Sequence, residues 1–335
     1  MTGPRHGAAR GSLLRVEVAR LTARRFIQII AALAALGFVV LAVLSFFNYS
    51  KPTAEVLAEA EARRDADLVL FEQYRQDCLA DETLPEEERE FICGEPQTVE
   101  NLPIEFYIDT PPFTLENDLP AGGLAVAAAT AMIGFVIGAT YVGAEWSTRS
   151  MVALLFWEPR RLTVIGVKTV VAAAAGALLA LVGQLAWFGL ARVLAAARGA
   201  PEELPAGFWG DVVGQGGRSV LLGVVATLLG FGLANLIRNT GAALGVGFAY
   251  FAVVESAVRG FRPQLQPFLV TDSSAALLLD GGLTVFIYEP TVDESDIQEF
   301  TELVVSNLRG GLTLAVYTVV LLVVGSWLFR RRDLH

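Results

Sequence analysis

Six long apolar runs dominate this chain of 335 residues and restrict what it can fold into. Each run approaches or exceeds the roughly 20 residues that an α-helix needs to cross the hydrocarbon core of a bilayer. The runs occupy residues 26–47, 120–143, 165–191, 219–237, 240–258 and 310–329. Backbone polar groups must be paired inside lipid, and the runs are too long and uniform for barrel strands. The sequence therefore predicts an all-α polytopic membrane protein with six transmembrane helices.

Basic residues collect on one side of this predicted bundle. With a cytoplasmic N-terminus, the inside segments hold 14 basic and four acidic residues, which leaves 11 basic and 31 acidic residues outside. The inside basic residues are Arg5, Arg10, Arg15, Arg20, Arg24, Arg25, Arg149, Arg160, Arg161, Lys168, Arg238, Arg330, Arg331 and Arg332. Arginine retained on the cytoplasmic flanks orients helices. We expect a multi-pass protein of the cell membrane with both termini in the cytoplasm, including the tail 330–335.

The N-terminal segment, residues 1–25, predicts an amphipathic helix at the cytoplasmic interface. Leu14, Val18 and Leu21 share one helical face, whereas Arg20 and Arg24 lie on another. The following apolar run is preceded by too long a basic stretch for a signal peptide and is followed by no small-residue cleavage pattern. We expect it to remain as an anchor. The alternative for the N-terminal segment is a solvated arginine-rich tail.

Residues 48–119 predict an acidic extracellular domain, with 19 acidic and five basic residues and five prolines in its second half. Both cysteines of the chain, Cys78 and Cys93, lie here. On an oxidising face of the membrane such a pair favours one disulfide that closes a short loop. Two free thiols are the alternative. A metal site is not expected, because no histidine is near.

Two further segments are expected outside the cell. Residues 192–218 contain Pro201, Pro205 and several glycines and are typical of an ordinary loop. In the longer segment 259–309, the apolar stretch Ala275–Tyr288 is too short to span and is interrupted at Asp280. We expect this segment to dip into the membrane face or to cap the bundle.

Several classes of chemistry are excluded by residues that the chain lacks. The only histidines are His6 and His335, at the two ends, so no Ser-His or Cys-His pair and no ordinary zinc site can form in the body. No G-x-x-x-x-G-K-[ST] motif is present for binding ATP. We expect no enzymatic activity, no cofactor or metal in this chain, and no nucleic-acid partner.

The interiors of the predicted spans carry no charged residue near their centres, where ion-coupled transporters usually place one. Gln184 is a weak candidate for lining a polar path, although a helix-to-helix hydrogen bond is the favoured interpretation. Glycine pairs recur at close-packing spacing, at Gly134 and Gly138 and again at Gly241 and Gly245. Such pairs let helices approach each other closely.

A polar segment of mixed charge, residues 144–164, separates the second and third predicted spans on the cytoplasmic side. Its pattern predicts a short helix that ends near Pro159. Its aromatic side chains are of the kind that binds in a groove on a partner protein. The candidate docking residues are Glu145, Trp146, Arg149, Leu154, Leu155, Glu158, Pro159, Arg160 and Arg161. The alternative is a topology signal, in which the arginine pair only holds the third span in place.

This layout resembles the permease subunit of type 2 ATP-binding-cassette (ABC) exporters, which have six spans, cytoplasmic ends, an interfacial helix and a coupling helix between spans two and three. The residues that carry the resemblance are Glu145, Met151, Leu154, Leu155, Pro159, Arg160, Arg161, Lys168 and the closing Phe329-Arg330-Arg331-Arg332-Asp333. Arg149-Ser150 departs from the family's usual Gly-Thr. The resemblance implies a cytoplasmic ABC ATPase subunit as partner, which binds the ATP and Mg²⁺, and a second copy or a paralogous permease.

Two functions remain open. The first is an export permease for a hydrophobic or amphiphilic cargo, driven by the separate ATPase. The second is a non-transporting sensor or scaffold whose acidic extracellular loop binds a peptide or a cation. An ATPase gene beside this one favours the first, and a signalling kinase or regulator gene favours the second.

Overall fold

The computed structural model describes residues 6–86, 89–148, 150–157, 160–288 and 300–331. The chain is largely helical, and six of its helices are long and apolar enough to cross a membrane, which confirms the predicted number of spans. They are α2 (Arg25–Asn48), α5 (Leu115–Ser147), α7 (Arg161–Arg198), α8 (Phe208–Ile237), the continuous stretch Thr240–Phe261 and α12 (Asn307–Arg331). The helices are longer than the apolar runs, because hydropathy identifies only the part of each helix that fits the hydrocarbon core of the bilayer.

The fifth of these helices is not uniform. It begins as α9 (Thr240–Ala249), continues through a π-helical turn, η2 (Tyr250–Glu255), and ends as α10 (Ser256–Phe261). Its start is sharp because the Asn239 side chain accepts a hydrogen bond from the Ala242 amide, and Arg238 ends α8 in the left-handed conformation, φ 62°. π-helical turns are rare and often occur at functional sites.

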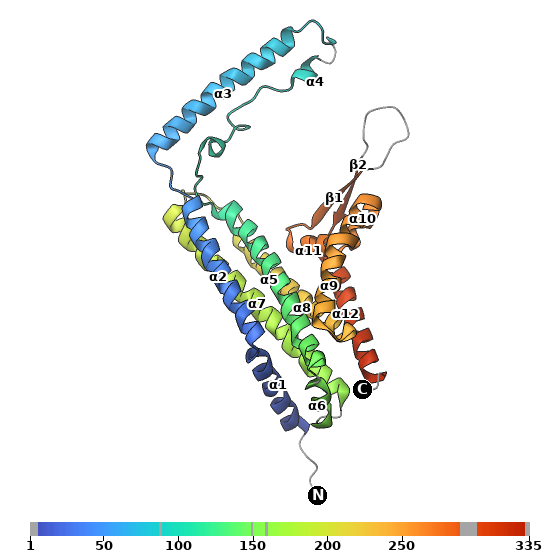
Figure 1. Ribbon diagram of the computed structural model, residues 1–335. Helices are drawn as coiled ribbons and strands as arrows, with labels where there is room; N and C mark the ends of the chain where they lie inside the picture. The colour runs from blue at the N-terminus through green and yellow to red at the C-terminus, as the bar shows by residue number, and fades with distance from the viewer. Residues whose placement is uncertain (1–5, 87–88, 149, 158–159, 289–299, 332–335) are drawn as a thin grey trace. The chain divides into compact units, whose positions relative to one another are not determined.

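The chain divides into two compact units. The first unit comprises Met1–Leu36, Leu119–Gly189 and Pro205–His335, and the second comprises Gly37–Asp118 and Leu190–Leu204. The first unit contains α1 (His6–Thr22) and the short α6 (Ser150–Trp157) together with most of the long helices (Figure 1).

Helix α8 supplies much of the core of the first unit, and it is the most buried of the six spanning helices. Glycines let α5 and α7 approach it closely. A Cβ atom added to Gly138 would lie 2.0 Å from the carbonyl oxygen of Thr227, and one added to Gly176 would lie 2.4 Å from the Thr227 hydroxyl. The Gly134–Gly138 pair therefore packs as predicted, whereas nothing lies within 4 Å of a Cβ built on Gly245.

The segment between the fifth and sixth spanning helices differs from the all-α prediction. After η3 (Pro263–Phe268) and α11 (Val270–Leu278), the chain forms an antiparallel pair of strands, β1 (Leu283–Tyr288) and β2 (Phe300–Val305), in the register Leu283↔Val305 to Tyr288↔Phe300. Val285, Ile287 and Val305 face a small core with Ala276. Val285 and Ile287 alternate along β1, and β-branched side chains at this spacing favour a strand.

The second unit carries α3 (Ala54–Ala80), α4 (Arg89–Cys93) and η1 (Ile104–Tyr107). The side chain of Thr53 begins α3 by accepting from the Val56 amide, and Ala60 is the one buried residue of this helix. The Tyr107 hydroxyl donates to Asp67 at 3.0 Å and so fastens η1 to α3.

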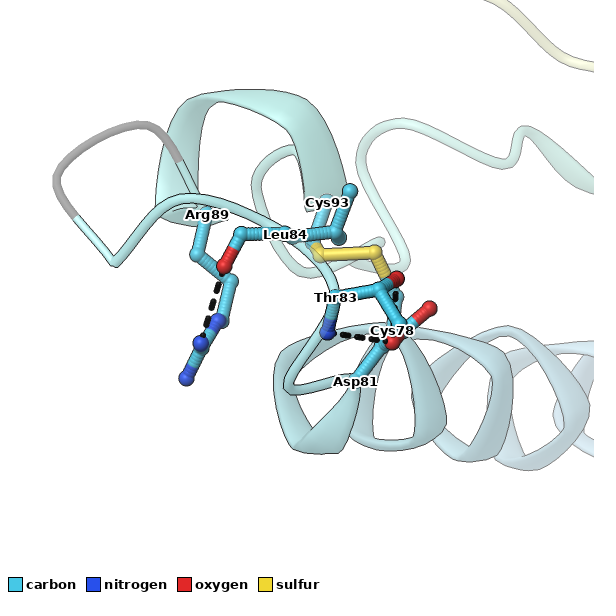
Figure 2. The surroundings of a disulfide bond; sticks show 6 residues. All are labelled: Cys78, Asp81, Thr83, Leu84, Arg89 and Cys93. Atoms are coloured by element: carbon cyan, nitrogen blue, oxygen red, sulfur yellow. Dashed lines mark hydrogen bonds between the residues drawn. A yellow bond between two sulfur atoms is a disulfide. The ribbon is translucent and has the colours of Figure 1, made fainter.

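A disulfide joins Cys78 to Cys93, as the sequence predicts, with their Cα atoms 5.7 Å apart. Figure 2 shows the turn beside it, where an Asp81 carboxylate oxygen accepts from both the amide and the hydroxyl of Thr83, at 2.9 and 2.7 Å. These two hydrogen bonds lower the pKa of Asp81. The Arg89 guanidinium donates to the Leu84 carbonyl and closes the loop between the two cysteines.

Candidate functional site

A buried group of charged side chains lies in the first unit where α1, α5 and α7 meet. The ammonium group of Lys168, on α7, is fully buried and pairs with two carboxylates, Glu17 at 2.5 Å and Glu145 at 2.7 Å. Glu17 comes from α1 and Glu145 from the last turns of α5. A buried ammonium is costly unless its charge is compensated, and the two carboxylates provide that compensation.

Two arginines and a tyrosine complete the group, which we call the ionic cluster: Glu17, Arg20, Arg24, Tyr141, Glu145 and Lys168. Arg24 pairs with Glu145 at 2.8 Å and donates to the Thr140 carbonyl at 3.0 Å. Arg20 pairs with Glu17 at 3.1 Å, and the Tyr141 hydroxyl donates to Glu17 at 2.7 Å. Arg24 and Lys168 also lie 5.4 and 5.0 Å from the centre of the Tyr141 ring.

The ionic cluster couples separate parts of the chain through its ion pairs. Its members come from α1, α5 and α7 and, for Arg24, from the turn after α1, and Glu17 and Lys168 are 151 positions apart. Removing one partner of such a buried pair leaves a charge without compensation, at a cost of about 3–5 kcal/mol. A displacement of the end of α5 is therefore resisted by α1 and by α7 together.

The short helix α6 follows the ionic cluster directly. Met151, Leu154 and Leu155 point into the apolar core that also contains Tyr141 and Val142. Phe156 lies on the opposite side and is 85% exposed. Helix α6 is therefore anchored in the core on one face while it presents the Phe156 ring on the other.

Three predicted docking residues are buried, whereas a surface helix over 145–158 would leave them exposed. Glu145 belongs to α5 and is buried in the ionic cluster, and Leu154 and Leu155 are buried beneath α6. In this structure these three side chains contact the rest of the chain itself. The sequence could not distinguish the buried face of so short a helix from the exposed one.

Two of the remaining predicted residues, Trp146 and Arg161, contact the end of α12. The Trp146 ring meets the Phe329 ring edge-on at 5.6 Å, and the Arg238 guanidinium lies 4.3 Å above it. Arg161 donates to the Phe329 carbonyl at 3.1 Å, whereas Arg160 is exposed. Arg149, Glu158 and Pro159 lie outside the described residues.

Gln184, the weak candidate for a polar path, makes a helix-to-helix hydrogen bond. Its amide donates to the Gly123 carbonyl at 2.9 Å. Trp187 on α7 and Gln215 on α8 donate in the same way to Leu119 and Pro120, at 2.9 and 3.1 Å. Three side-chain donors thus hold the start of α5, and Gln184 has a packing role there.

A second buried polar group, which sequence reasoning missed, joins η2 to α11. The Glu255 carboxylate accepts from the Thr271 hydroxyl and from its amide, the latter at 3.1 Å. Arg259 bridges Glu255 and Asp272 at 3.4 and 2.8 Å. The available signal was a lone carboxylate close to the end of an otherwise apolar run.

The ionic cluster also had signals that sequence reasoning did not use. Glu17 is the only acidic residue among the arginines of the N-terminal segment, and Lys168 is one of two lysines in the chain. Lys168 lies inside the third apolar run, where an isolated charge calls for a partner. Across the described part of the chain, no three His, Cys, Asp or Glu side chains come together as metal ligands.

Comparison with known proteins does not assign a family. No protein-family model matches the chain, and no curated protein is significantly similar to it in sequence. The features of this chain that bear on function are the ionic cluster and the exposed face of α6.

Proposed function

We propose that this chain is the membrane-spanning permease subunit of an ATP-driven ABC exporter of the type 2 class. The observation that carries the proposal is the ionic cluster, which fastens the α5 end next to the exposed Phe156 to both α1 and α7. A permease that depends on a separate ATPase needs a segment that binds the ATPase and transmits its movement to the spanning helices. The α5–α6 segment has both properties.

In this proposal the two termini and α6 are cytoplasmic, and a separate ATPase subunit docks on α6 through Phe156 and Arg160. ATP and Mg²⁺ bind to that subunit and not to this chain. Closure of the ATPase pushes on α6, whose Leu154 and Leu155 press on the core, while Lys168 carries the movement into α7. A second copy of the chain, or a paralogous permease, completes the pathway in the cell membrane.

The proposed cargo is hydrophobic or amphiphilic. The support is the apolar character of the spanning helices and the absence of a charged side chain near their centres. Ion coupling through a mid-membrane carboxylate does not fit that composition, so the driving energy is assigned to ATP.

Co-purification with an ABC ATPase subunit from the same genome tests the proposal. The tagged chain should bring down that ATPase from detergent, and the pair should hydrolyse ATP in proteoliposomes. Phe156→Asp should reduce both recovery and turnover by about tenfold, because a central aromatic anchor can contribute 2 kcal/mol or more to an interface. Phe106→Asp is the matched control, since this aromatic ring is also exposed but lies in the second unit.

Unchanged recovery and turnover with Phe156→Asp would contradict docking on α6. If no ATPase associates with the wild-type chain at all, the alternative of a non-transporting sensor or scaffold gains support. The observation that favours this alternative is the acidic second unit, whose exposed apolar side chains are described next.

A further inference from the structure

The second unit exposes large apolar side chains that belong to none of the candidate spans. Tyr74 is 61% exposed, Phe106 is 77% exposed and Phe91 is 91% exposed, and Leu70 is also exposed. Burial in a membrane-spanning helix does not account for them, because α3, α4 and η1 are not among the candidate spans. Apolar groups gathered on the surface of a non-spanning unit mark an interaction site.

Two attachments hold η1 and α4 to one face of α3, the face that carries Leu70 and Tyr74. Asp67, Leu70, Tyr74 and Cys78 follow each other at intervals of three or four residues and so share one face of the helix. Asp67 binds η1 through Tyr107, and Cys78 binds α4 through the disulfide.

The flanking aromatic residues sit next to these attachments. Phe106 precedes Tyr107 on η1, and Phe91 lies two residues before Cys93 on α4, so both belong to the segments attached to this face of α3. Figure 1 shows α4 beside the C-terminal end of α3. We call Leu70, Tyr74, Phe91 and Phe106 the apolar stripe.

Negative charge surrounds the apolar stripe. Residues 48–119 contain 19 acidic and five basic residues, a formal net charge of −14 (five minus 19). The helical arginines are already paired within α3: Arg63 with Glu59, Arg64 with Asp65 and Arg75 with Glu72. Acidic residues directly precede the stripe's aromatic residues or attachments in sequence: Asp77 before Cys78, Glu90 before Phe91 and Glu105 before Phe106.

The adjoining face of α3 has the same mixed character. A shallow depression of about 680 Å³ lies on it, lined by Leu68, Val69, Glu72, Gln73, Gln76 and Asp77. Apolar side chains and carboxylates are therefore mixed on this face of the helix. An occupant must supply apolar groups and positive charge together.

We propose that the second unit binds cationic amphipathic peptides on the apolar stripe. A second copy of this chain fits poorly, because two units of charge −14 repel each other, and an anionic membrane surface is repelled in the same way. A neutral apolar ligand would leave the carboxylates without a role. A peptide with lysine or arginine beside apolar residues provides apolar contacts for the stripe and positive charge for the carboxylates. Its cations can also lie against the aromatic rings. This inference does not rest on the proposed transport function.

Direct binding to the full-length protein tests the inference. The chain is placed in nanodiscs of zwitterionic lipid, and the probe is a fluorescent amphipathic helical peptide made of leucine and lysine. Anisotropy should show saturable binding above that of empty nanodiscs, and binding should weaken as salt is raised. The same peptide with glutamate in place of lysine should bind at least about tenfold more weakly, a difference of about 1.4 kcal/mol.

Variants locate the binding surface. Leu70→Ser with Tyr74→Ser, and separately Asp77→Asn with Glu105→Gln, should each weaken binding of the lysine peptide by about tenfold. The matched control is Glu55→Gln with Val56→Ser, about 20 Å away at the start of α3. Non-reducing mass mapping confirms in each variant that Cys78 and Cys93 remain joined.

Two results would overturn the inference: binding no stronger than to empty nanodiscs, or equal affinity for the lysine and glutamate peptides. Stripe variants that keep wild-type affinity would also overturn it. Because the assay contains no ATPase, these results leave the permease proposal standing, and failure of the ATPase co-purification leaves this inference standing.

Discussion

Lys168 shows how a single side chain can hold a membrane bundle together. Its ammonium group is fully buried and is shared by carboxylates from α1 and α5. Each carboxylate has an arginine of its own, Arg20 for Glu17 and Arg24 for Glu145. The charges are therefore compensated only as a group, and loss of one member affects all the others.

Replacement of the lysine should destabilise the protein strongly. Lys168→Met leaves two buried carboxylates close together, and we expect the free energy of unfolding in mixed detergent micelles to fall by about 3–5 kcal/mol. Lys51→Met is the matched control, because Lys51 is exposed and donates only to the Ala196 carbonyl. Adding Glu17→Gln to Lys168→Met should recover part of the loss. Equal unfolding curves for Lys168→Met and the wild type would show that the cluster does not stabilise the fold.

An exposed residue, Glu72, provides a titration test of the second unit. Hydrogen bonds from Arg75, and then from Gln76, lower the pKa of Glu72 from 4.5 to about 2. A lowered pKa means that the Glu72–Arg75 link contributes above about pH 4.5 and is lost as the pH falls toward 2.

NMR of the carboxyl carbons in the full-length protein should place the Glu72 midpoint near 2. Arg75→Gln should raise that midpoint, whereas Arg63→Gln, which removes the partner of Glu59, should not move it. A Glu72 midpoint that stays in place in Arg75→Gln would show that the ion pair does not form.

At the scale of helices, two glycine pairs with the same spacing have different surroundings. Gly138 lies against the backbone of α8, while the face of α9 that carries Gly245 is open within the chain. Sequence spacing alone makes them equivalent. The difference is decided by which helix passes nearby.

Alanine substitution should separate the two glycines. Gly138→Ala meets a backbone carbonyl that cannot move aside, so we expect the free energy of unfolding to fall by about 1–3 kcal/mol. Gly245→Ala adds a methyl group in open space and should leave stability unchanged or raise it by up to about 1 kcal/mol through helix propensity. Thermal unfolding of both variants in the same detergent is the measurement. Similar losses in both would mean that α5 does not pack closely on α8.

At the scale of the whole molecule, the membrane orientation is testable by labelling. In a background with Cys78 and Cys93 replaced by serine, single cysteines at Ser147 and Arg238 should be protected from an impermeant thiol reagent in intact cells. Cysteines at Asp81 and Glu203 should react. Labelling at Ser147 in intact cells, while Asp81 stays protected, would reverse the orientation that the arginine distribution predicts.

Properties that depend on local composition were predictable from the sequence. The six spanning helices follow from the length and hydropathy of the apolar runs, since each run must satisfy its backbone by itself in lipid. The disulfide follows from the presence of two cysteines only, both in the acidic segment. The start of α3 at Thr53 follows from a side chain that caps its own helix.

Properties that depend on partners far away in the chain were decided only by the tertiary structure. Glu145 was predicted to face a partner protein, but the fold brings Lys168 and Arg24 to it and buries Glu145 and Lys168. Likewise, β1 and β2 form only as a pair, because the backbone of each strand makes its hydrogen bonds to the other strand. Charge and hydropathy are properties of single residues and can be read from the sequence. Whether a charge can be buried depends on which opposite charge the fold places beside it.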